Sequence, residues 1–252
     1  MHAIHTPHTD RAKPMTPTDR RQRERSRRAD AILVHARALI TDVGAEGFQM
    51  ERLARAAGCA KGTLYCHFPS REHVIVALAN REFGGLLTAL RTATEVHTSP
   101  TDRVIAAFEA ASLRQETDPS SVLWHAARCL PHIRTVGEPG AQTASAYCRQ
   151  HAHLTQRFCD EVDDALLLGE LEAVRGDGQA IGRAVVALLS TAQTSAAGVD
   201  VGPNTAQTRL LFWHVIHGLA TPAVKATLDA RYTRVQQRTR TVLASRAQAS
   251  CQ

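Results

Sequence analysis

The chain has 252 residues, a formal net charge of +6 and an aromatic content of 4%. Its abundant Ala and Leu favour helices that pack through small side chains. No apolar run approaches the roughly 18 residues of a membrane span, and the N-terminus lacks the apolar core of a signal peptide. Six cysteines lie far apart without a C-x-x-C pair. We therefore expect reduced thiols in a cytoplasmic protein that has no membrane partner.

Basic charge gathers at the two ends of the chain. Residues 1–28 carry eight Lys and Arg against three acids, and residues 225–252 carry six against one. Basic ends around a slightly acidic middle indicate local attraction to a polyanion, with solubility alone as the alternative for the N-terminal tail. Pro7, Pro14 and Pro17 among polar residues predict that residues 1–19 are disordered.

The N-terminal third of the chain predicts four helices. Apolar residues at helical spacing run from Ile32 to Val43, Gly44 is expected to end that helix, and Gly58 supplies the turn between two short helices. Ser70 is expected to cap a longer linking helix. Two short helices joined by a tight turn, the second with a polar outer face, are typical of a helix-turn-helix DNA reader. The predicted helices are 29–43, 50–57, 61–68 and 70–93.

The remainder of the chain predicts further helices and no strand. The segments 137–140, 176–178 and 202–204 are expected to be connections, and the last helix is expected to break near Thr221-Pro222. The predicted fold is therefore all-α, with a small N-terminal helix-turn-helix domain and a larger C-terminal helical domain. The expected helices are 101–116, 119–130, 141–168, 179–199 and 205–244. The expected divisions are a tail at 1–19, a DNA-binding domain with its linking helix at 20–93, an effector-binding and dimerisation domain at 94–246, and a tail at 247–252.

Residues 53–68 follow the pattern L-A-x-x-A-G-x-x-K-G-T-L-Y-x-H-F. On this pattern the segment from about Arg27 to Phe83 resembles the DNA-binding domain of TetR-family transcriptional regulators, while the rest of the chain matches the family in size and helical content. The resemblance implies a ligand-responsive homodimer, a repressor that binds a palindromic operator in double-stranded DNA and is released by a small-molecule effector, with no cofactor. The residues that carry it are Leu53, Ala54, Ala57, Gly58, Lys61, Gly62, Thr63, Leu64, Tyr65, His67 and Phe68.

Several side chains of this segment are predicted to contact the DNA backbone. Lys61 and Arg71 can neutralise phosphate charge, and the Tyr65 hydroxyl can donate to a phosphate oxygen. Core packing of the ring is the alternative for Tyr65. Gln49 can also donate to phosphate, and Arg52 completes the predicted DNA-binding set.

Base reading is assigned to the start of the second short helix. Thr63 and Gly62 lie where the family brings its recognition helix to base edges. Thr can contact a thymine methyl or hydrogen-bond either type of base, and Gly removes side-chain bulk so that the helix can seat deeply. His67 resembles a family residue near the DNA backbone, with packing against Phe68 as the equal alternative.

Two helix starts depart from the family pattern. Gln49 and Ala60 stand where the family often has Ser or Thr, and neither residue is a good N-cap. Glu51 can accept a hydrogen bond from cytosine if it reaches the groove, but we expect it to pair with Arg55 one turn later. These departures concern the operator sequence rather than the DNA-binding class.

One reader helix covers too few base pairs for a specific site, so the C-terminal domain is expected to form a dimer. The resemblance implies a four-helix interface built from the last two long helices, with ordinary core packing as the alternative for each residue. The predicted interface residues are Val185, Leu188, Leu189, Ala192, Leu210, Leu211, His214 and His217.

The resemblance also implies an apolar effector pocket in the C-terminal domain. Aromatic residues are scarce there, so those present are the leading candidates, with plain core packing as the alternative. The predicted lining is Phe108, Leu113, Trp124, His125, Tyr147 and Phe158.

Two other classes of function stay open. Cys148, His151, His153 and Cys159 share one predicted helix and suit zinc, but their spacing matches no standard site and no catalytic motif supports an all-α metal-dependent enzyme. The chain is therefore expected not to be an enzyme. The basic ends also fit a non-specific architectural DNA-binding protein, which would bind with steep salt dependence and no preference for a palindrome.

Overall fold

The computed structural model describes residues 16–117, 122–135, 137–172, 177–191 and 205–249. Within these ranges every regular element is a helix, apart from an isolated bridge between Leu171 and Ala220. Across the same ranges, no helix combines the length and the apolar character that a membrane crossing needs. The helices are α1 (Pro17–Gly47), α2 (Met50–Ala56), α3 (Lys61–His67), α4 (Arg71–Thr94), α5 (Pro100–Thr117), α6 (Val122–Arg134), α7 (Gly137–Leu167), α8 (Gly178–Thr191), α9 (Thr205–Leu219), α10 (Pro222–Lys225) and α11 (Leu228–Ala249).

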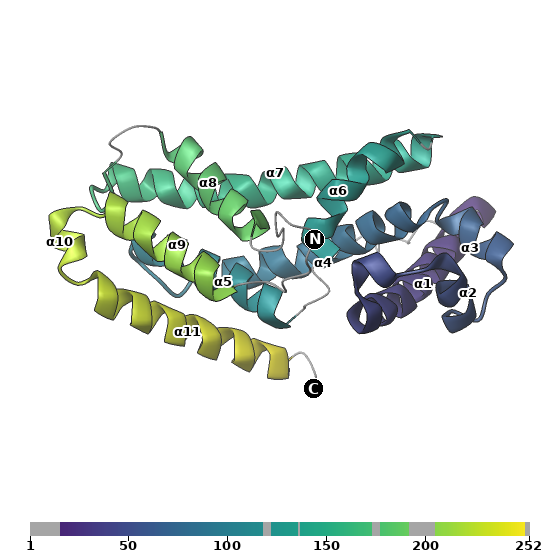
Figure 1. The fold of residues 1–252 in the computed structure, drawn as a ribbon, viewed down its shortest axis with the longest axis horizontal. Helices are drawn as coiled ribbons and strands as arrows, with labels where there is room; N and C mark the ends of the chain where they lie inside the picture. Colours follow the sequence, from purple (N-terminus) through teal and green to yellow (C-terminus); the bar gives the residue numbers. More distant parts are fainter. Residues whose placement is uncertain (1–15, 118–121, 136, 173–176, 192–204, 250–252) are drawn as a thin grey trace, which may run out of the picture.

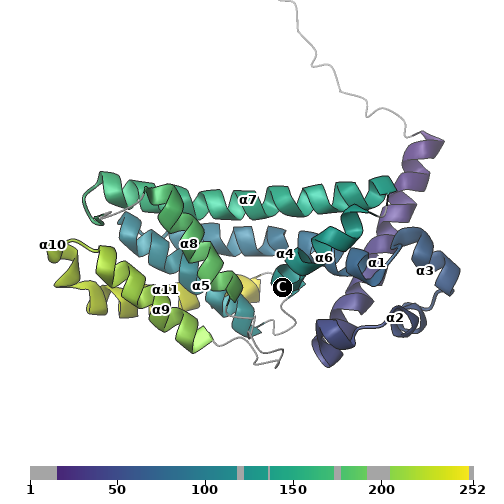
Figure 2. The same ribbon diagram turned by 45° about the horizontal axis from the view of Figure 1, so that its top comes forward.

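The helices form a small unit and a larger body that share α4. Helices α1 to α3 gather at one end of the molecule, and α4 runs from them into the body (Figure 1). In the body α7 and α11 lie on opposite sides, with α4 and α5 between them (Figures 1 and 2). This arrangement confirms the predicted all-α fold with an N-terminal helix-turn-helix unit and a larger C-terminal helical part.

Helix α4 joins the two parts because buried residues recur along its whole length. Its first turns bury Val74, Ile75 and Leu78, and its later turns bury Leu86 and Leu90. It packs against α1 on one side and against α5, α6, α7 and α11 along its length. Ser70 caps its start as predicted, since the Ser70 hydroxyl accepts from the backbone N–H of His73 at 3.3 Å.

Helix α1 starts earlier than the sequence pattern predicted. Thr16 and Asp19 form a reciprocal capping box around Pro17, the first helical residue, so residues 17–19 are helical rather than part of a disordered tail. Gly44 adopts φ 74°, which breaks the regular helix where a stop was predicted, and a last turn continues to Gly47. The rest of the predicted tail, residues 1–15, lies outside the described residues.

The boundaries in the body differ from the prediction at several places, and α6 continues to Arg134 where the prediction ended at residue 130. The glycine-rich segment 137–140 is the first turn of α7 rather than a connection. The predicted helix 179–199 is described as α8 only to Thr191, because residues 192–204 lie outside the described ranges. The expected break near Thr221-Pro222 is confirmed, since α9, the short α10 and α11 divide the final segment, and α11 continues to Ala249.

Candidate nucleic-acid interface

The turn between α2 and α3 is held by a glycine and by a compact apolar core. Gly58 adopts φ 59°, a left-handed conformation that favours glycine after a helix end. Leu53 of α2, Leu64 of α3 and Phe68 are buried between these helices and their neighbours. Because helices of seven residues are marginal alone, this core fixes the direction in which α3 faces solvent.

The outer face of α3 carries the residues predicted to meet DNA. Lys61, Gly62 and Tyr65 are exposed, while Thr63 is half-buried. The Tyr65 side chain is 43% exposed, so the alternative of core packing is wrong for this residue. A Cβ added to Gly62 would meet no atom within 4 Å, so nothing inside the protein requires glycine at this position.

Glu51 pairs across the turn rather than along its own helix. Its carboxylate lies 3.0 Å from the Lys61 ammonium of α3, so the expected pair with Arg55 is wrong. The Lys61 hydrogen bond lowers the pKa of Glu51, which keeps this carboxylate charged. The ion pair places a negative charge beside the cation that was predicted to bind phosphate.

The N-terminal half of α1 adds cations beside α3 that the site prediction did not include. The Arg25 guanidinium donates to the backbone carbonyl of Cys66 at 3.1 Å, and Arg28 borders the same hollow as His67. Burial, followed by the charges of Arg25 and Arg28, lowers the pKa of His67. The basic run 20–28 was visible in the sequence, but its position against α3 depends on the tertiary packing of α1.

His67 and Arg71, like Lys61, have neighbours within the protein. The His67 ring is tilted against Phe68 with 6.4 Å between the centroids, which is the packing alternative considered for it. Arg71, in the first turn of α4, lies 4.0 Å from Glu46 of α1. Gln49, which precedes α2, and Arg52 of α2 are exposed.

The two weak helix starts predicted from the sequence are confirmed. Gln49 before α2 and Ala60 before α3 both have extended backbones, and neither makes a side-chain capping hydrogen bond. The first N–H groups of both helices therefore lack the partner that Ser or Thr would supply.

Three of the six residues predicted to line an effector pocket are buried in the protein core. Phe108 is stacked on Phe212 with 3.7 Å between the ring centroids, and Tyr147 packs edge-on against Phe83 at 5.2 Å. Phe158 is fully buried. These three aromatic side chains fill space between helices, and their assignment to an effector pocket stays a prediction. Leu113 does border a cavity, and the side chains of Trp124 and His125 lie outside the described set.

The predicted dimer residues divide between the core and the surface. Val185 and Leu189 are fully buried on the face of α8 that contains Gly182, where an added Cβ would lie 2.7 Å from the Cα of Cys159. That close contact with α7 makes this face internal, so the dimer prediction is wrong for both residues. Leu188 is half-buried, and Ala192 lies outside the described residues.

Helix α9 presents the other predicted dimer residues outward. Leu210 and Leu211 are 58% and 53% exposed, and His214 is also exposed. His217 is half-buried with its ring stacked on Trp213, 4.6 Å between centroids. Two adjacent leucines in water form an apolar patch that remains a predicted contact for a second copy.

Three of the four Cys and His residues of α7 have a contact within the protein, and His153 is exposed. The Arg134 guanidinium lies 3.3 Å from the Cys148 sulfur, the His151 ring stacks on Tyr147, and the Cys159 thiol donates to the Gln179 carbonyl. In the described part of the chain, no group of three or more His, Cys, Asp or Glu side chains could hold a metal ion.

The helix-turn-helix unit is similar in sequence to known bacterial regulators. The model of the family described as "Bacterial regulatory proteins, tetR family" matches residues 32–78. The HTH-type transcriptional repressor KstR of Mycolicibacterium smegmatis is 44% identical over 62 residues, which is 25% of this chain and 29% of that protein. The chain thus matches less than a third of this relative's length.

Solved structures extend the similarity of fold to the body. The ketosteroid transcriptional regulator KstR2 of Mycobacterium tuberculosis superposes with a TM-score of 0.55 at 17% identity, covering 77% of this chain and 95% of that one. AibR, solved with isovaleryl coenzyme A and operator DNA, gives a TM-score of 0.51 at 19% identity, covering 77% and 98%. The helix-turn-helix unit is therefore similar in sequence to the tetR family of bacterial regulatory proteins, and the body is similar in fold to solved transcriptional regulators.

Proposed function

We propose that this protein is a homodimeric transcriptional repressor that binds an inverted-repeat operator and is released by a small-molecule effector. The observation that carries the proposal is the outer face of α3, where Lys61, Gly62 and Tyr65 are exposed on a helix whose other face is fixed by the core. Such a helix can enter the major groove while its polar side chains meet phosphates and base edges.

Three further observations support the proposal. The relative KstR is named a repressor, and AibR was solved with both an operator and an acyl coenzyme A. The basic N-terminal half of α1 lies beside α3 and adds positive charge to the same surface. The exposed Leu210 and Leu211 of α9 offer a second copy an apolar contact.

Fluorescence anisotropy with DNA from beside this protein's own gene tests the reader surface. Tyr65→Phe removes one hydroxyl, and we expect about ten-fold weaker binding if that hydroxyl donates to phosphate. Gly62→Ala should weaken binding at least as much by adding bulk at the groove, although the helix itself gains stability. Gly84→Ala is the matched control, because a Cβ there also meets nothing within 4 Å and Gly84 is an exposed residue of α4.

The result separates two classes of DNA binding. The wild-type protein should bind an inverted repeat more tightly than DNA of the same length in which the sequences of the half-sites are scrambled. Binding that ignores the repeat, falls steeply with salt and is unchanged by Gly62→Ala would instead indicate a non-specific architectural protein.

A further inference from the structure

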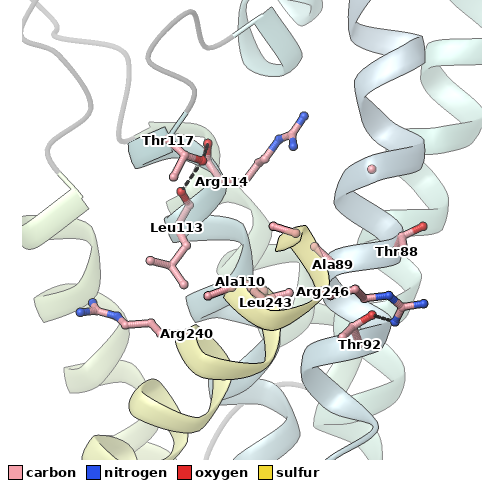
Figure 3. A pocket seen from close by; sticks show the side chains of 13 residues that line it. Thr88, Ala89, Thr92, Ala110, Leu113, Arg114, Thr117, Arg240, Leu243 and Arg246 are labelled. Atoms are coloured by element: carbon pink, nitrogen blue, oxygen red, sulfur yellow. Dashed lines mark hydrogen bonds between the residues drawn. The ribbon is translucent and has the colours of Figure 1, made fainter. Parts of the chain in front are cut away.

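A cavity of about 560 Å³ lies between α4, α5 and α11 in the body. This volume is within the range of about 300 to 1,000 Å³ that is usual for small-molecule sites. Its walls are mainly apolar or small, with Ala89 from α4, Ala110 and Leu113 from α5, and Leu243 from α11 (Figure 3). The cavity can therefore accept the apolar body of a ligand.

Two guanidinium groups reach this cavity from different helices. Arg114 extends from α5 toward α4, and Arg246 crosses from α11 to donate to the hydroxyl of Thr92 on α4 (Figure 3). Arg240 also borders the cavity, but its guanidinium is tied to Glu109 at 3.0 Å. None of the described lining residues is Asp or Glu, and the carboxylate that pairs with Arg114, Glu82, is shared with Arg37, so the guanidinium charge beside the apolar wall is only partly balanced. That combination is complementary to an amphipathic anion.

Arg114 also connects the cavity to the helix-turn-helix unit. Its guanidinium forms an ion pair with one carboxylate oxygen of Glu82 on α4, and Arg37 of α1 forms an ion pair with the other oxygen. Glu82 is buried, so this shared carboxylate is poorly screened by solvent. One buried acid thus links a wall of the cavity to the first helix of the reader unit.

We propose that this cavity holds the effector and that the effector is a small amphipathic anion, an apolar body carrying a carboxylate. The proposal rests on the proposed function and deepens it. The ligand carboxylate competes with Glu82 for Arg114. When Glu82 loses its ion pair with Arg114, its ion pair with Arg37 of α1 changes. The ligand can shift the position of the reader unit only by as much as the ligand binds the arrangement without the Glu82–Arg114 pair more tightly than the arrangement with it.

Calorimetric titration of the full chain with decanoate tests the site without any DNA. Decanoate should bind the wild type, whereas decanol and decylammonium, which share the tail, should bind at least about ten-fold more weakly. Arg114→Met should weaken decanoate binding by a similar factor. Ala89→Phe, which fills the cavity and leaves every charge in place, should abolish it. Arg91→Met, on the exposed side of α4, is the matched control and should bind like the wild type.

Circular dichroism tests whether each variant is folded. Arg114→Lys serves as a second variant if Arg114→Met does not fold. The inference is overturned if decanoate does not bind the wild type, if decanol binds equally well, or if folded Arg114→Met and Ala89→Phe bind decanoate unchanged. A protein that binds decanoate in this way but binds no DNA would refute the proposed function and leave the site standing. A protein that binds its operator but no decanoate would refute only this inference.

The link to α1 has its own test. Decanoate should weaken operator binding by the wild type, and Arg37→Met should still bind decanoate while its operator affinity responds at least about five-fold less. An operator affinity that responds equally in Arg37→Met and wild type would overturn the Glu82 connection. No response in the wild type would overturn the assignment of the cavity to the effector.

Discussion

At the scale of single residues, the Glu51–Lys61 ion pair is expected to weaken DNA binding. The pair holds a negative charge 3.0 Å from the cation that is predicted to meet phosphate. Glu51→Gln should raise operator affinity about five-fold and steepen the dependence of log affinity on log salt by about one unit, because Lys61 then displaces a full counterion. Anisotropy titrations at several salt concentrations measure both.

Glu95→Gln controls for the change in net charge, since Glu95 lies in an exposed pair at the far end of α4. Unchanged or weaker binding by Glu51→Gln, with Glu95→Gln equal to wild type, would show that Lys61 does not contact phosphate.

A second residue-scale feature is the buried His73 at the start of α4. Burial lowers its pKa below the ordinary value of 6.5, so the folded protein favours the neutral ring. Below about pH 6.5 the unfolded chain binds a proton at His73 that the folded chain resists. The free energy of unfolding should therefore be larger at pH 7.5 and decrease as the pH drops to 5.5. Burial lowers the pKa of His97 and His151 as well, and both add to this slope.

Urea denaturation at a series of pH values measures that slope. His73→Gln should flatten it, and His153→Gln, at an exposed site on α7, is the control. Stability that stays constant or rises between pH 7.5 and 5.5 would contradict the assignment.

At the scale of elements, the uncapped start of α3 is a local weakness in the reader unit. Ala60 already has the extended backbone of an N-cap but offers no oxygen to the first N–H groups. Ala60→Ser should stabilise the protein by about 1 kcal/mol through a new capping hydrogen bond. Ala152→Ser, at an exposed position inside α7, should instead destabilise it slightly. Urea midpoints compare the two, and equal effects would mean that α3 starts without need of a cap.

The helices show how far the sequence could predict this structure. Apolar spacing predicted α2, α3 and α4 well, because one face of each must be buried whatever its partner is. The start of α1 was missed although Thr16, Pro17 and Asp19 are a readable cap signal, since they lie among prolines that suggested a tail. The partner of Glu51 was missed because a helical i,i+4 rule cannot see a lysine across a turn.

The body was harder to predict for a physical reason. A stripe of Val185, Leu189 and small residues on α8 has the same spacing whether it packs on α7 or on a second copy. The tertiary structure identifies it as internal, through the burial of Val185 and Leu189 and the close contact of Gly182 with Cys159. The cavity is lined by α4 and α5 together with α11, which lies more than a hundred residues later in the chain. The residue proposed to bind the ligand there is Arg114, and no aromatic residue is among the lining residues that the structure describes.

At the scale of the whole molecule, the buried carboxylate of Glu109 ties the C-terminal helices to α5. Its side chain is 1% exposed, and it accepts from Arg209 of α9 at 2.9 Å and from Arg240 of α11 at 3.0 Å. Glu109→Gln should lower the free energy of unfolding by about 3 kcal/mol, because two cations lose their shared partner. Urea denaturation measures the loss, with Glu95→Gln as an exposed control expected to change stability by less than about 1 kcal/mol. Equal, small effects in both variants would show that the Glu109 cluster does not hold α9 and α11 to α5.

The central claim is that two copies of this chain place their α3 helices in successive major grooves of one duplex. Protection footprinting on the DNA beside its own gene tests that claim most directly. We predict two protected half-sites in inverted order, with centres separated by about 34–36 Å or a multiple of that distance, and loss of both in Gly62→Ala. Protection without symmetry, or an identical footprint from Gly62→Ala, would contradict it.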